Sequence, residues 1–588
     1  MSWPLKQQLQ KQLAAEQGAV VFAPGSRPAF ALAYPNSYHV GMSNLGVQII
    51  YQQINRRADT ACERLFLPDK KALQEYARTN TPLMTIETQR PLYQFPLIGF
   101  AVSFEMDYFN MLRMLELGRV PLRSAQRDES HPLVIAGGPC ATFNPEPIAD
   151  FVDVFVVGEG EEVIHDFLSA YHSGRQAGLS RRELLLSLAQ VAGLYVPQFY
   201  QPVYKDDGTL ARYERLAPVP ARIGRRWVRQ LDDFPGQTVI VTDDTEFKDM
   251  FLVETARGCG RHCRFCMAGY CFRRPRSRSL EKLQEAISDA RRYRNKVGLV
   301  GAAISDYPEI DELTRFIMAQ GMQMSVASLR ADSLSQSLVD ALAASGHKTI
   351  TLAPEAASLR MRRIINKGIT DEHLDRAVTL AVEAGIPHVR LYIMVGLPFE
   401  ADEDITAIAA MARRIKKHME AKGSNGRLTL SVNPFIPKPF TPFQRVPMTD
   451  FAVVEARLKA LQGMLKGVKG IELLVESPKE AYIQGVLARG DRRLAPVLLA
   501  ANEKGGAKGW RAASREAALD EAFYLYRERP VTEVLPWQHL DMGLDEAYLA
   551  EEMKRAAAEQ ATPPCAPGCT RCGVCKPPVK KEESREQV

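Results

Sequence analysis

Residues 250–266 read MFLVETARGCGRHCRFC, an apolar run followed by three cysteines with the spacing C-x3-C-x2-C. The run at 250–255 has the length and composition of a buried parallel strand, so Cys259, Cys263 and Cys266 follow its carboxyl end. Three thiolates on one tight loop can bind three irons of a cubane iron–sulfur cluster, which leaves the fourth iron without a protein ligand. The stretch therefore predicts an open metal site at the end of a strand.

The chain beyond this loop alternates apolar runs of strand length with helical patterns. The further candidate strands are residues 297–303, 322–328, 347–353, 388–396 and 427–435. Together with the first run they make six strand–helix units joined by short turns. This alternation of strands and helices predicts an open, partial (β/α)6 barrel over residues 247–450. The active site of such a fold lies at the carboxyl ends of the strands.

The N-terminal part of the chain shows the same alternation from about residue 28 to 172. We expect residues 1–200 to form a Rossmann-like α/β domain with an open, mostly parallel sheet and helices on both faces. Its turns at 34–46, 137–139 and 158–160 carry glycines and polar residues. Ligands of such sheets bind beyond the carboxyl ends of the strands, so these turns are candidate binding loops.

The remaining segments have weaker patterns. Residues 201–246 contain several prolines, and we expect a connector or a small excursion of strands there. Residues 451–560 are mainly helical in pattern, with one candidate strand at 471–477 (IELLVES). Residues 561–588 form a cysteine-rich tail, whose charged, apolar-poor end at 577–588 predicts disorder.

Composition limits the class of protein. The 588-residue chain is 46% hydrophobic and 24% charged, as in ordinary globular proteins, and its length predicts two or three domains. Its start lacks the apolar core of a signal peptide, and no segment offers the roughly 18 apolar residues of a membrane span. We therefore expect a cytoplasmic protein. Seven of its ten cysteines fall in two spaced sets, which predicts metal or redox chemistry rather than a disulfide framework, and Cys62, Cys140 and Cys271 lie outside these sets.

The tail repeats the spacing of the first cysteine set. Cys565, Cys569 and Cys572 again follow C-x3-C-x2-C, and Cys575 adds a fourth thiol. Four thiolates saturate a site, which is typical of structural or electron-transferring centres rather than of a catalytic metal. The pattern predicts a second iron–sulfur cluster or a zinc knuckle, and the basic residues around it leave nucleic-acid binding open.

Arginines surround the first cysteine set without an acidic residue among them. They are Arg257, Arg261, Arg264, Arg273, Arg274, Arg276 and Arg278. Guanidinium groups can offset the negative charge of a thiolate-ligated cluster and of a carboxylate-bearing cofactor. The alternatives are a solvated basic face and a binding surface for a polyanion such as RNA.

The cysteine loop resembles that of the radical S-adenosylmethionine (SAM) superfamily. Cys259, Cys263 and Cys266 match its motif, Phe265 is the aromatic residue before the last cysteine, and a β/α series follows. The resemblance implies a 4Fe–4S cluster whose open iron binds SAM, reductive cleavage to a 5′-deoxyadenosyl radical, and an electron donor such as flavodoxin or ferredoxin. A zinc or ferredoxin-type site is the alternative. It lacks a local fourth ligand unless Cys271 supplies one, and we expect Cys271 to be a buried apolar cysteine.

The same resemblance assigns cofactor contacts to residues at the strand ends. Polar groups there would hold the ribose, amino and carboxylate groups, and glycine would allow close approach of the adenine. The matching positions are Phe265, Ser305, Asp306, Ser328, Arg330, Glu355 and Gly396. Turn chemistry is the alternative explanation for each position.

A Rossmann-like domain before such a barrel resembles the cobalamin-binding-domain class of the superfamily, in particular a functionally uncharacterised subfamily. Residues 137–162 and 350–370 are close to what that class shows. The cobalamin motif D-x-H-x-x-G is absent, because His39 lies two residues before Gly41 with no aspartate upstream. Some members bind cobalamin without this histidine, so cobalamin stays open as a further cofactor.

The sequence thus predicts a radical SAM enzyme, with cobalamin-dependent methylation of an unactivated carbon as its leading reaction. One alternative is RNA or protein methylthiolation with an auxiliary cluster, although the N-terminal domain offers only Cys62 and Cys140 for it. Another is an RNA-binding protein with structural metal clusters. The substrate stays open, with RNA and protein among the candidates.

Overall fold

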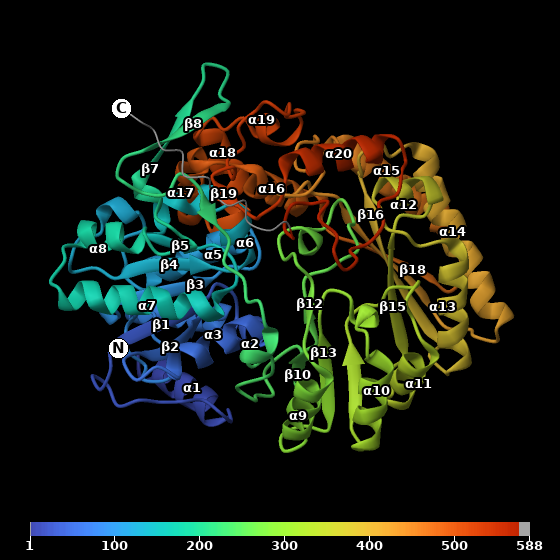
Figure 1. Cartoon of the computed structure of the whole chain (residues 1–588), viewed down its shortest axis with the longest axis horizontal. Helices are drawn as coiled ribbons and strands as arrows, with labels where there is room; N and C mark the ends of the chain where they lie inside the picture. The colour runs from blue at the N-terminus through green and yellow to red at the C-terminus, as the bar shows by residue number, and fades with distance from the viewer. Residues whose placement is uncertain (1, 576–588) are drawn as a thin grey trace.

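The computed structural model describes residues 2–575 and consists of two α/β halves that face each other (Figure 1). The disorder predicted for 577–588 lies outside the described residues. Among the helices that are described, none combines the length and the apolar composition needed to cross a bilayer.

The N-terminal half is an open sheet in the order β2-β1-β3-β4-β5-β6, in which β6 alone among the described strands runs antiparallel. Its central strands are buried on both faces, which explains their continuous apolar runs. The strands are β1 (Ala29–Tyr34), β2 (Ala61–Phe66), β3 (Leu97–Ala101), β4 (Leu133–Gly137), β5 (Val154–Val156) and β6 (Leu194–Tyr195).

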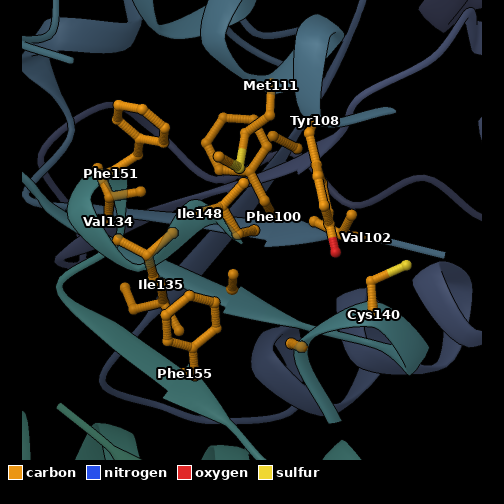
Figure 2. Close-up of a cluster of buried hydrophobic side chains, with 14 of the residues drawn as sticks. Phe100, Val102, Tyr108, Met111, Val134, Ile135, Cys140, Ile148, Phe151 and Phe155 are labelled. Atoms are coloured by element: carbon orange, nitrogen blue, oxygen red, sulfur yellow. The ribbon is translucent and has the colours of Figure 1, made fainter. Parts of the chain in front are cut away.

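Helices cover this sheet and complete its core. The sequence prediction of a Rossmann-like sheet is confirmed, with the principal helices α3 (Leu45–Asn55), α5 (Asp107–Leu117) and α7 (Gly160–Gln176). Figure 2 shows the packing of Phe100, Val134 and Phe155 from the strands with Met111 from α5. Cys140 lies at the edge of the same cluster and is 5% exposed.

The second half is the predicted partial barrel, built from two parallel sheets. The first has the order β10-β13-β14 and the second the order β15-β16-β17-β18, with a parallel bridge between Leu329 and Leu352 that joins them. The strands are β10 (Phe251–Glu254), β13 (Lys296–Val300), β14 (Gln323–Val326), β15 (Thr349–Glu355), β16 (His388–Val395), β17 (Leu428–Pro434) and β18 (Ile471–Val475).

The barrel extends past residue 450, where the sequence placed its end. β18 pairs in parallel with β17, although its residues were assigned to the helical region. The sequence did not place β18 in the barrel because this strand lies at a sheet edge and is only partly buried along its length. An edge strand of this kind lacks the continuous apolar run of a buried parallel strand.

The C-terminal helices return to the N-terminal sheet rather than forming a separate unit. α16 (Pro478–Arg489), α17 (Ala495–Glu503) and α18 (Trp510–Glu516) share one hydrophobic core with it, and the Phe109 and Trp510 rings pack edge to face at 5.9 Å. The segment predicted as a connector contributes β9 (Ile223–Gly224), which pairs with β19 (Leu540–Asp541).

The chain then crosses back to the barrel. α20 (Glu546–Ala557) packs against α12 (Leu359–Ile364), with Ala556 in contact with the cluster around Met361. In Figure 1 this red segment runs above the barrel strands. The described cysteines of the tail therefore lie beside the cysteine loop of the barrel, since the Cys565 N–H bonds to the Gly260 carbonyl oxygen.

Candidate active site at the barrel mouth

The cysteine loop begins directly after β10, as the sequence predicted. β11 (Ala256–Arg257) and β12 (Arg276–Ser277) pair antiparallel and close the ends of the loop. Gly258 adopts φ +79°, and a Cβ there would lie 2.2 Å from the carbonyl oxygen of Phe272. Only glycine fits this turn, because both the backbone conformation and the space exclude a side chain.

The three thiols of the loop are partly or fully buried, and their charges interact. Burial, and then the neighbouring Cys263, raise the pKa of Cys259; burial and Cys263 also raise the pKa of Cys266 to about 11. Within residues 2–575, no three His, Cys, Asp or Glu side chains converge as ligands of a single ion. Three thiols on one short loop fit an iron–sulfur cluster, in which each thiolate binds a different iron.

Two buried cations, Arg330 and Lys367, interact with the charge of Cys263. Lys367 Nζ lies 3.2 Å from Glu355 Oε1 and 5.9 Å from the centre of the Phe265 ring. Burial lowers the pKa of Lys367, but the charges of Glu355 and Cys263 outweigh it and raise the pKa overall. Fixed positive charge at this point can stabilise a thiolate-ligated cluster or a bound carboxylate.

A cavity of about 690 Å³ lies at the carboxyl ends of the barrel strands, and we call it the barrel-mouth cavity. Phe265 of the cysteine loop and Glu355 of β15 both line it. Glu355 has φ +66° after a register shift in β15, a strained conformation of the kind that clusters at functional sites. The structure thus brings these two predicted residues together.

Sequence reasoning missed other residues of the barrel-mouth cavity. Tyr392 and Met394 reach it from β16, Asn433 from β17, and Glu476 and Glu480 from the segment after β18. Alternate residues of β16 are only half-buried, which is the period-two signal that could have identified Tyr392 and Met394. An asparagine near the end of the otherwise apolar strand β17 was a second usable signal.

Ser305 and Asp306 line a different cavity of about 580 Å³, beside Cys259 and Arg261, which we call the motif-side cavity. Asp306 accepts two hydrogen bonds from Arg261, at 2.7 and 2.5 Å, so its carboxylate is already paired. Ser305 Oγ accepts a hydrogen bond from Ser333 at 2.9 Å. These two predicted residues therefore lie near the cysteine loop but outside the barrel-mouth cavity.

Ser328 and Gly396 are not among the described residues that line either cavity. Ser328 is exposed after β14. Gly396 has φ +86°, and its N–H donates to Glu400 Oε2 at 2.7 Å while its carbonyl oxygen accepts from Thr449 Oγ1 at 2.9 Å. The positive φ of Gly396 forms a turn after β16, and both of its backbone polar groups are hydrogen-bonded within the protein.

A third cavity of about 500 Å³ lies between the two halves, and we call it the interface cavity. Its floor is the point where the order of the N-terminal strands reverses, between β1 and β3, which is the ligand-binding edge of such sheets. The loops at 43–46, 137–139 and 158–161 surround it, all three at or near the predicted turns. From the barrel, Arg257 and Phe272 complete the wall.

His39 lines a different cavity from the interface cavity, together with Asp244. Its Nδ1 lies 3.0 Å from Asp244 and its Nε2 lies 3.4 Å from Glu246, and all three side chains are largely exposed. Among the described residues that line the interface cavity there is no histidine. The arrangement agrees with the absence of the D-x-H-x-x-G motif.

The arginines around the loop do not form a solvated basic face, because acids from distant segments pair with most of them. Arg257 contacts Glu159, Glu161 and Glu254 at 3.1, 2.7 and 2.9 Å. The other pairs are Arg261 with Asp306 and Asp332, Arg264 with Glu552, Arg276 with Glu159, and Arg278 with Glu254. The interpretation of this sequence as a polyanion-binding surface is wrong for these side chains.

The tail cysteines lie against the first cysteine loop. The N–H of Cys565 donates to the Gly260 carbonyl oxygen at 2.7 Å, and Cys565 lines the motif-side cavity together with Cys259. Cys572 is buried, and Cys575 is exposed. Sequence spacing gave no indication that the two sets touch.

Comparison with known proteins agrees with this geometry. Residues 46–197 match the family described as radical SAM proteins, N-terminal, and residues 253–412 match the radical SAM superfamily. An uncharacterised protein of Methanocaldococcus jannaschii is 30% identical over 472 residues, which cover 80% of this chain and 90% of that protein. An uncharacterised methyltransferase of Pyrococcus horikoshii is 26% identical over 297 residues, 48% of this chain and 58% of that protein.

Among solved structures, the radical SAM methyltransferase TsrM from Kitasatospora setae, with cobalamin and a 4Fe–4S cluster bound, superposes with a TM-score of 0.51. The match covers 84% of this chain and 99% of that chain at 14% identity, so the likeness concerns the fold. The open cysteine loop at the end of β10, the partial barrel around it and these matches lead to one assignment. The chain belongs to the radical SAM superfamily.

Proposed function

We propose that this protein cleaves SAM reductively at the barrel mouth and, with cobalamin held in the interface cavity, methylates an unactivated carbon. The binding of cobalamin is proposed on one observation. The ligand-binding edge of the N-terminal sheet and two residues of the cysteine loop, Arg257 and Phe272, line the same cavity. A cofactor bound at that edge lies between the sheet and the loop, where two cofactors can act on one substrate.

The side chains at the barrel mouth would have distinct roles. Cys259, Cys263 and Cys266 would hold a 4Fe–4S cluster, which supplies the electron for breaking the sulfonium bond of SAM. Glu355 and Lys367 form a buried ion pair beside Phe265, which suits them to hold the amino or hydroxyl groups and the carboxylate of SAM. The protein contributes orientation, fixed charge and exclusion of water.

The interface cavity suits a large ring with an apolar face. Its lining is mainly apolar, with Leu32, Ile50 and Ile164 among the side chains, and Ser43 and Asn44 supply polar groups at one side. Because no histidine is among the described lining residues, cobalt would bind without one from this chain. The methyltransferase from Kitasatospora setae, bound to cobalamin, offers the same fold as a precedent.

The barrel-mouth cavity favours a neutral or cationic substrate over RNA. Glu476 and Glu480 line it, and the one cation among its described lining residues, Lys438, is paired with Glu105, so a polyanion would meet repulsion there. The methylthiolation alternative needs auxiliary cysteines in the N-terminal domain, but Cys62 and Cys140 are each buried in its core. Methyl transfer to a small molecule or a peptide side chain is therefore the reaction we propose.

The test is anaerobic reconstitution of the full chain with iron, sulfide and hydroxocobalamin, followed by gel filtration. We expect about one cobalt per chain in the wild type and a loss of at least tenfold in Ala101→Trp, whose indole would fill the interface cavity. Leu216→Trp, at an exposed position, serves as the control and should retain cobalt. Failure of the wild type to retain cobalamin would remove the methyl-transfer proposal.

The radical step has a separate test. With SAM and dithionite, the wild type should form 5′-deoxyadenosine, and Cys266→Ala should reduce this by at least 100-fold because the cluster loses a ligand. Cys62→Ala, a buried cysteine of the other half, should leave it within about twofold. Formation of 5′-deoxyadenosine that survives in Cys266→Ala contradicts the assignment of the cluster.

A further inference from the structure

The cysteine-rich tail is docked on the first cysteine loop by several specific contacts. His262 and Cys565 lie 303 residues apart in the chain, yet His262 Nε2 is 3.2 Å from Cys565 Sγ. A Cβ on Gly260 would lie 3.2 Å from the Cβ of Cys565, so the two backbones approach closely. Asn366 bridges both segments, donating to the His262 carbonyl oxygen at 3.1 Å and accepting from the Thr562 N–H at 2.8 Å.

N–H donors point at the sulfurs of the tail. Arg571 Nε donates to Cys569 Sγ at 3.3 Å. Arg273 Nη2 lies 2.7 Å from His262 Nδ1 and can only donate, so Nδ1 is the acceptor and Nε2 carries the proton that faces Cys565 Sγ. N–H donors to sulfur are how proteins stabilise thiolates that bind iron–sulfur clusters.

Arg273 supplies the independent observation that an anion belongs here. Its side chain is almost fully buried at 1% exposure, and among the described residues it has no carboxylate within ion-pair distance. Its Nη1 has no hydrogen-bond partner there either, while Nε donates to the Gly269 carbonyl oxygen. The rings of Tyr270 and Tyr548 flank the guanidinium at 4.7 and 6.0 Å.

An unpaired buried guanidinium is costly, so a compensating negative charge is required nearby. Cys572 of the tail packs with Tyr270 and Tyr548, the rings that flank Arg273, and the charges of both Cys572 and Cys565 interact with this arginine. Cys572 is 4% exposed, and its carbonyl oxygen accepts a hydrogen bond from the Asp545 N–H at 2.9 Å. A cluster ligated by four thiolates carries net negative charge. Such a cluster would supply the negative charge that no described carboxylate provides within ion-pair distance of Arg273.

We propose that Cys565, Cys569, Cys572 and Cys575 bind a second iron–sulfur cluster that delivers electrons to the first. The hydrogen bond from the Cys565 N–H to the Gly260 carbonyl oxygen links a ligand of the second cluster to the neighbour of Cys259. Cys575 is exposed and opens the other side to an external donor. A zinc site with four thiolates would also carry negative charge. Zinc does not change oxidation state, however, so its position next to the first cysteine loop would have no role in electron transfer.

The electron transfer balances without any change in bonds. A one-electron protein donor of the flavodoxin or ferredoxin class is oxidised and reduces the tail cluster. The tail cluster is then oxidised as it reduces the loop cluster, and no proton is taken up or released. This relay rests on the proposed function, whereas the presence of the second cluster does not.

Metal analysis of the reconstituted full chain tests the second cluster. We expect about eight irons and eight sulfides per wild-type chain, and about four in Cys569→Ala/Cys572→Ala and in Cys259→Ala/Cys263→Ala. The control Cys62→Ala should keep about eight. One zinc with four irons, four irons alone in the wild type, or eight irons retained in the tail variant would each overturn the proposal.

The role of Arg273 is tested in the Cys259→Ala/Cys263→Ala protein, which would carry only the tail cluster. Arg273→Gln should shift its midpoint potential to a more negative value in an EPR-monitored titration, because a positive charge stabilises the reduced cluster. Arg273→Lys should restore most of the shift, and Arg274→Gln, at an exposed position, should cause none. Unchanged potential in Arg273→Gln, with iron content retained, argues against the placement of this cluster.

The relay is measured without SAM or substrate, so its outcome is independent of catalysis. Reduction of the loop cluster by a ferredoxin-type donor should be at least tenfold slower in Cys569→Ala/Cys572→Ala than in the wild type. Titanium(III) citrate should reduce both proteins at similar rates, because a small reductant needs no docking site. Equal rates with the protein donor would overturn the relay.

Discussion

Glu355 is the residue at which backbone strain, charge and position coincide. It ends β15 with a positive φ, lines the barrel-mouth cavity and pairs with the buried Lys367. Strain of this kind persists only where the surrounding structure holds it, so the position of the carboxylate is fixed before any ligand binds. A preformed acceptor of this type suits the hydroxyl or ammonium groups of a nucleoside cofactor.

Replacing Glu355 with glutamine keeps the shape of the side chain and removes its charge. We expect Glu355→Gln to weaken SAM binding by about 10- to 100-fold, the value of one hydrogen bond to a charged group, with unchanged iron content. Anaerobic equilibrium dialysis measures the affinity. Glu246→Gln, an exposed carboxylate beside His39, is the matched control, and equal affinities for the two variants would exclude Glu355 as a SAM contact.

At the scale of elements, α20 fixes the tail through one buried ion pair. Arg264 and Glu552 are both almost fully buried with Nε and Oε2 3.1 Å apart, and Thr562 Oγ1 donates to the same carboxylate at 2.7 and 2.8 Å. Arg264 also donates to the Gln560 carbonyl oxygen at 2.7 Å. The cysteine loop, the helix and the tail are therefore tied together at one point.

Removing this carboxylate should release the tail. Glu552→Ala leaves the Arg264 charge buried and unpaired, which costs about 3–5 kcal/mol. We expect faster cleavage of the tail in limited proteolysis and faster loss of its metal during gel filtration. Glu551→Ala, the exposed neighbour on the same helix, should behave like the wild type, and similar proteolysis of both variants would contradict this role for the pair.

At the scale of the whole molecule, Glu159 joins the two halves. Glu159 lies in the loop before α7 of the N-terminal half. Arg257 in β11 and Arg276 in β12, at the two ends of the cysteine loop, pair with it at 3.1 and 2.6 Å. Burial raises the pKa of Glu159, but the hydrogen bond from Arg276 and the charges of both arginines outweigh it and lower the pKa overall. The contact closes one side of the interface cavity.

The stabilisation by the Glu159 ion pairs should depend on pH in one direction. Because the folded pKa lies below the ordinary value of 4.5, the stabilisation is fully present above about pH 4.5 and is lost as pH falls through the folded pKa. Glu159→Gln should lower the stability of the apo-protein by about 2–4 kcal/mol at pH 7.5 and by less at pH 4, seen as a smaller Tm difference. Glu162→Gln, whose partner Arg226 lies near the surface, is the control. A Tm difference independent of pH would contradict the ion-pair role.

Local patterns predicted the elements well and their partners poorly. The run at 250–255 and the cysteines after it are contiguous, so spacing sufficed to place Cys259, Cys263 and Cys266 at the end of β10. Ser328 and Gly396 occupy strand ends but line neither of the two cavities beside the loop in the described structure, because their positions depend on how the turns fold back. Tyr392 and Asn433 carry local signals for one face of their strands, but the cavity that this face lines depends on how β16 and β17 pair, which no single strand encodes.

The sequence by itself determined two α/β halves, an open set of three cysteines after a strand and a closed set of four in the tail. The tertiary structure decided that these sets touch, that acids from distant segments pair with most of the arginines, and that Arg273 is left without one among the described residues. The physical reason is that strands and loops form from neighbouring residues, whereas burial and charge compensation depend on contacts between segments some 300 positions apart.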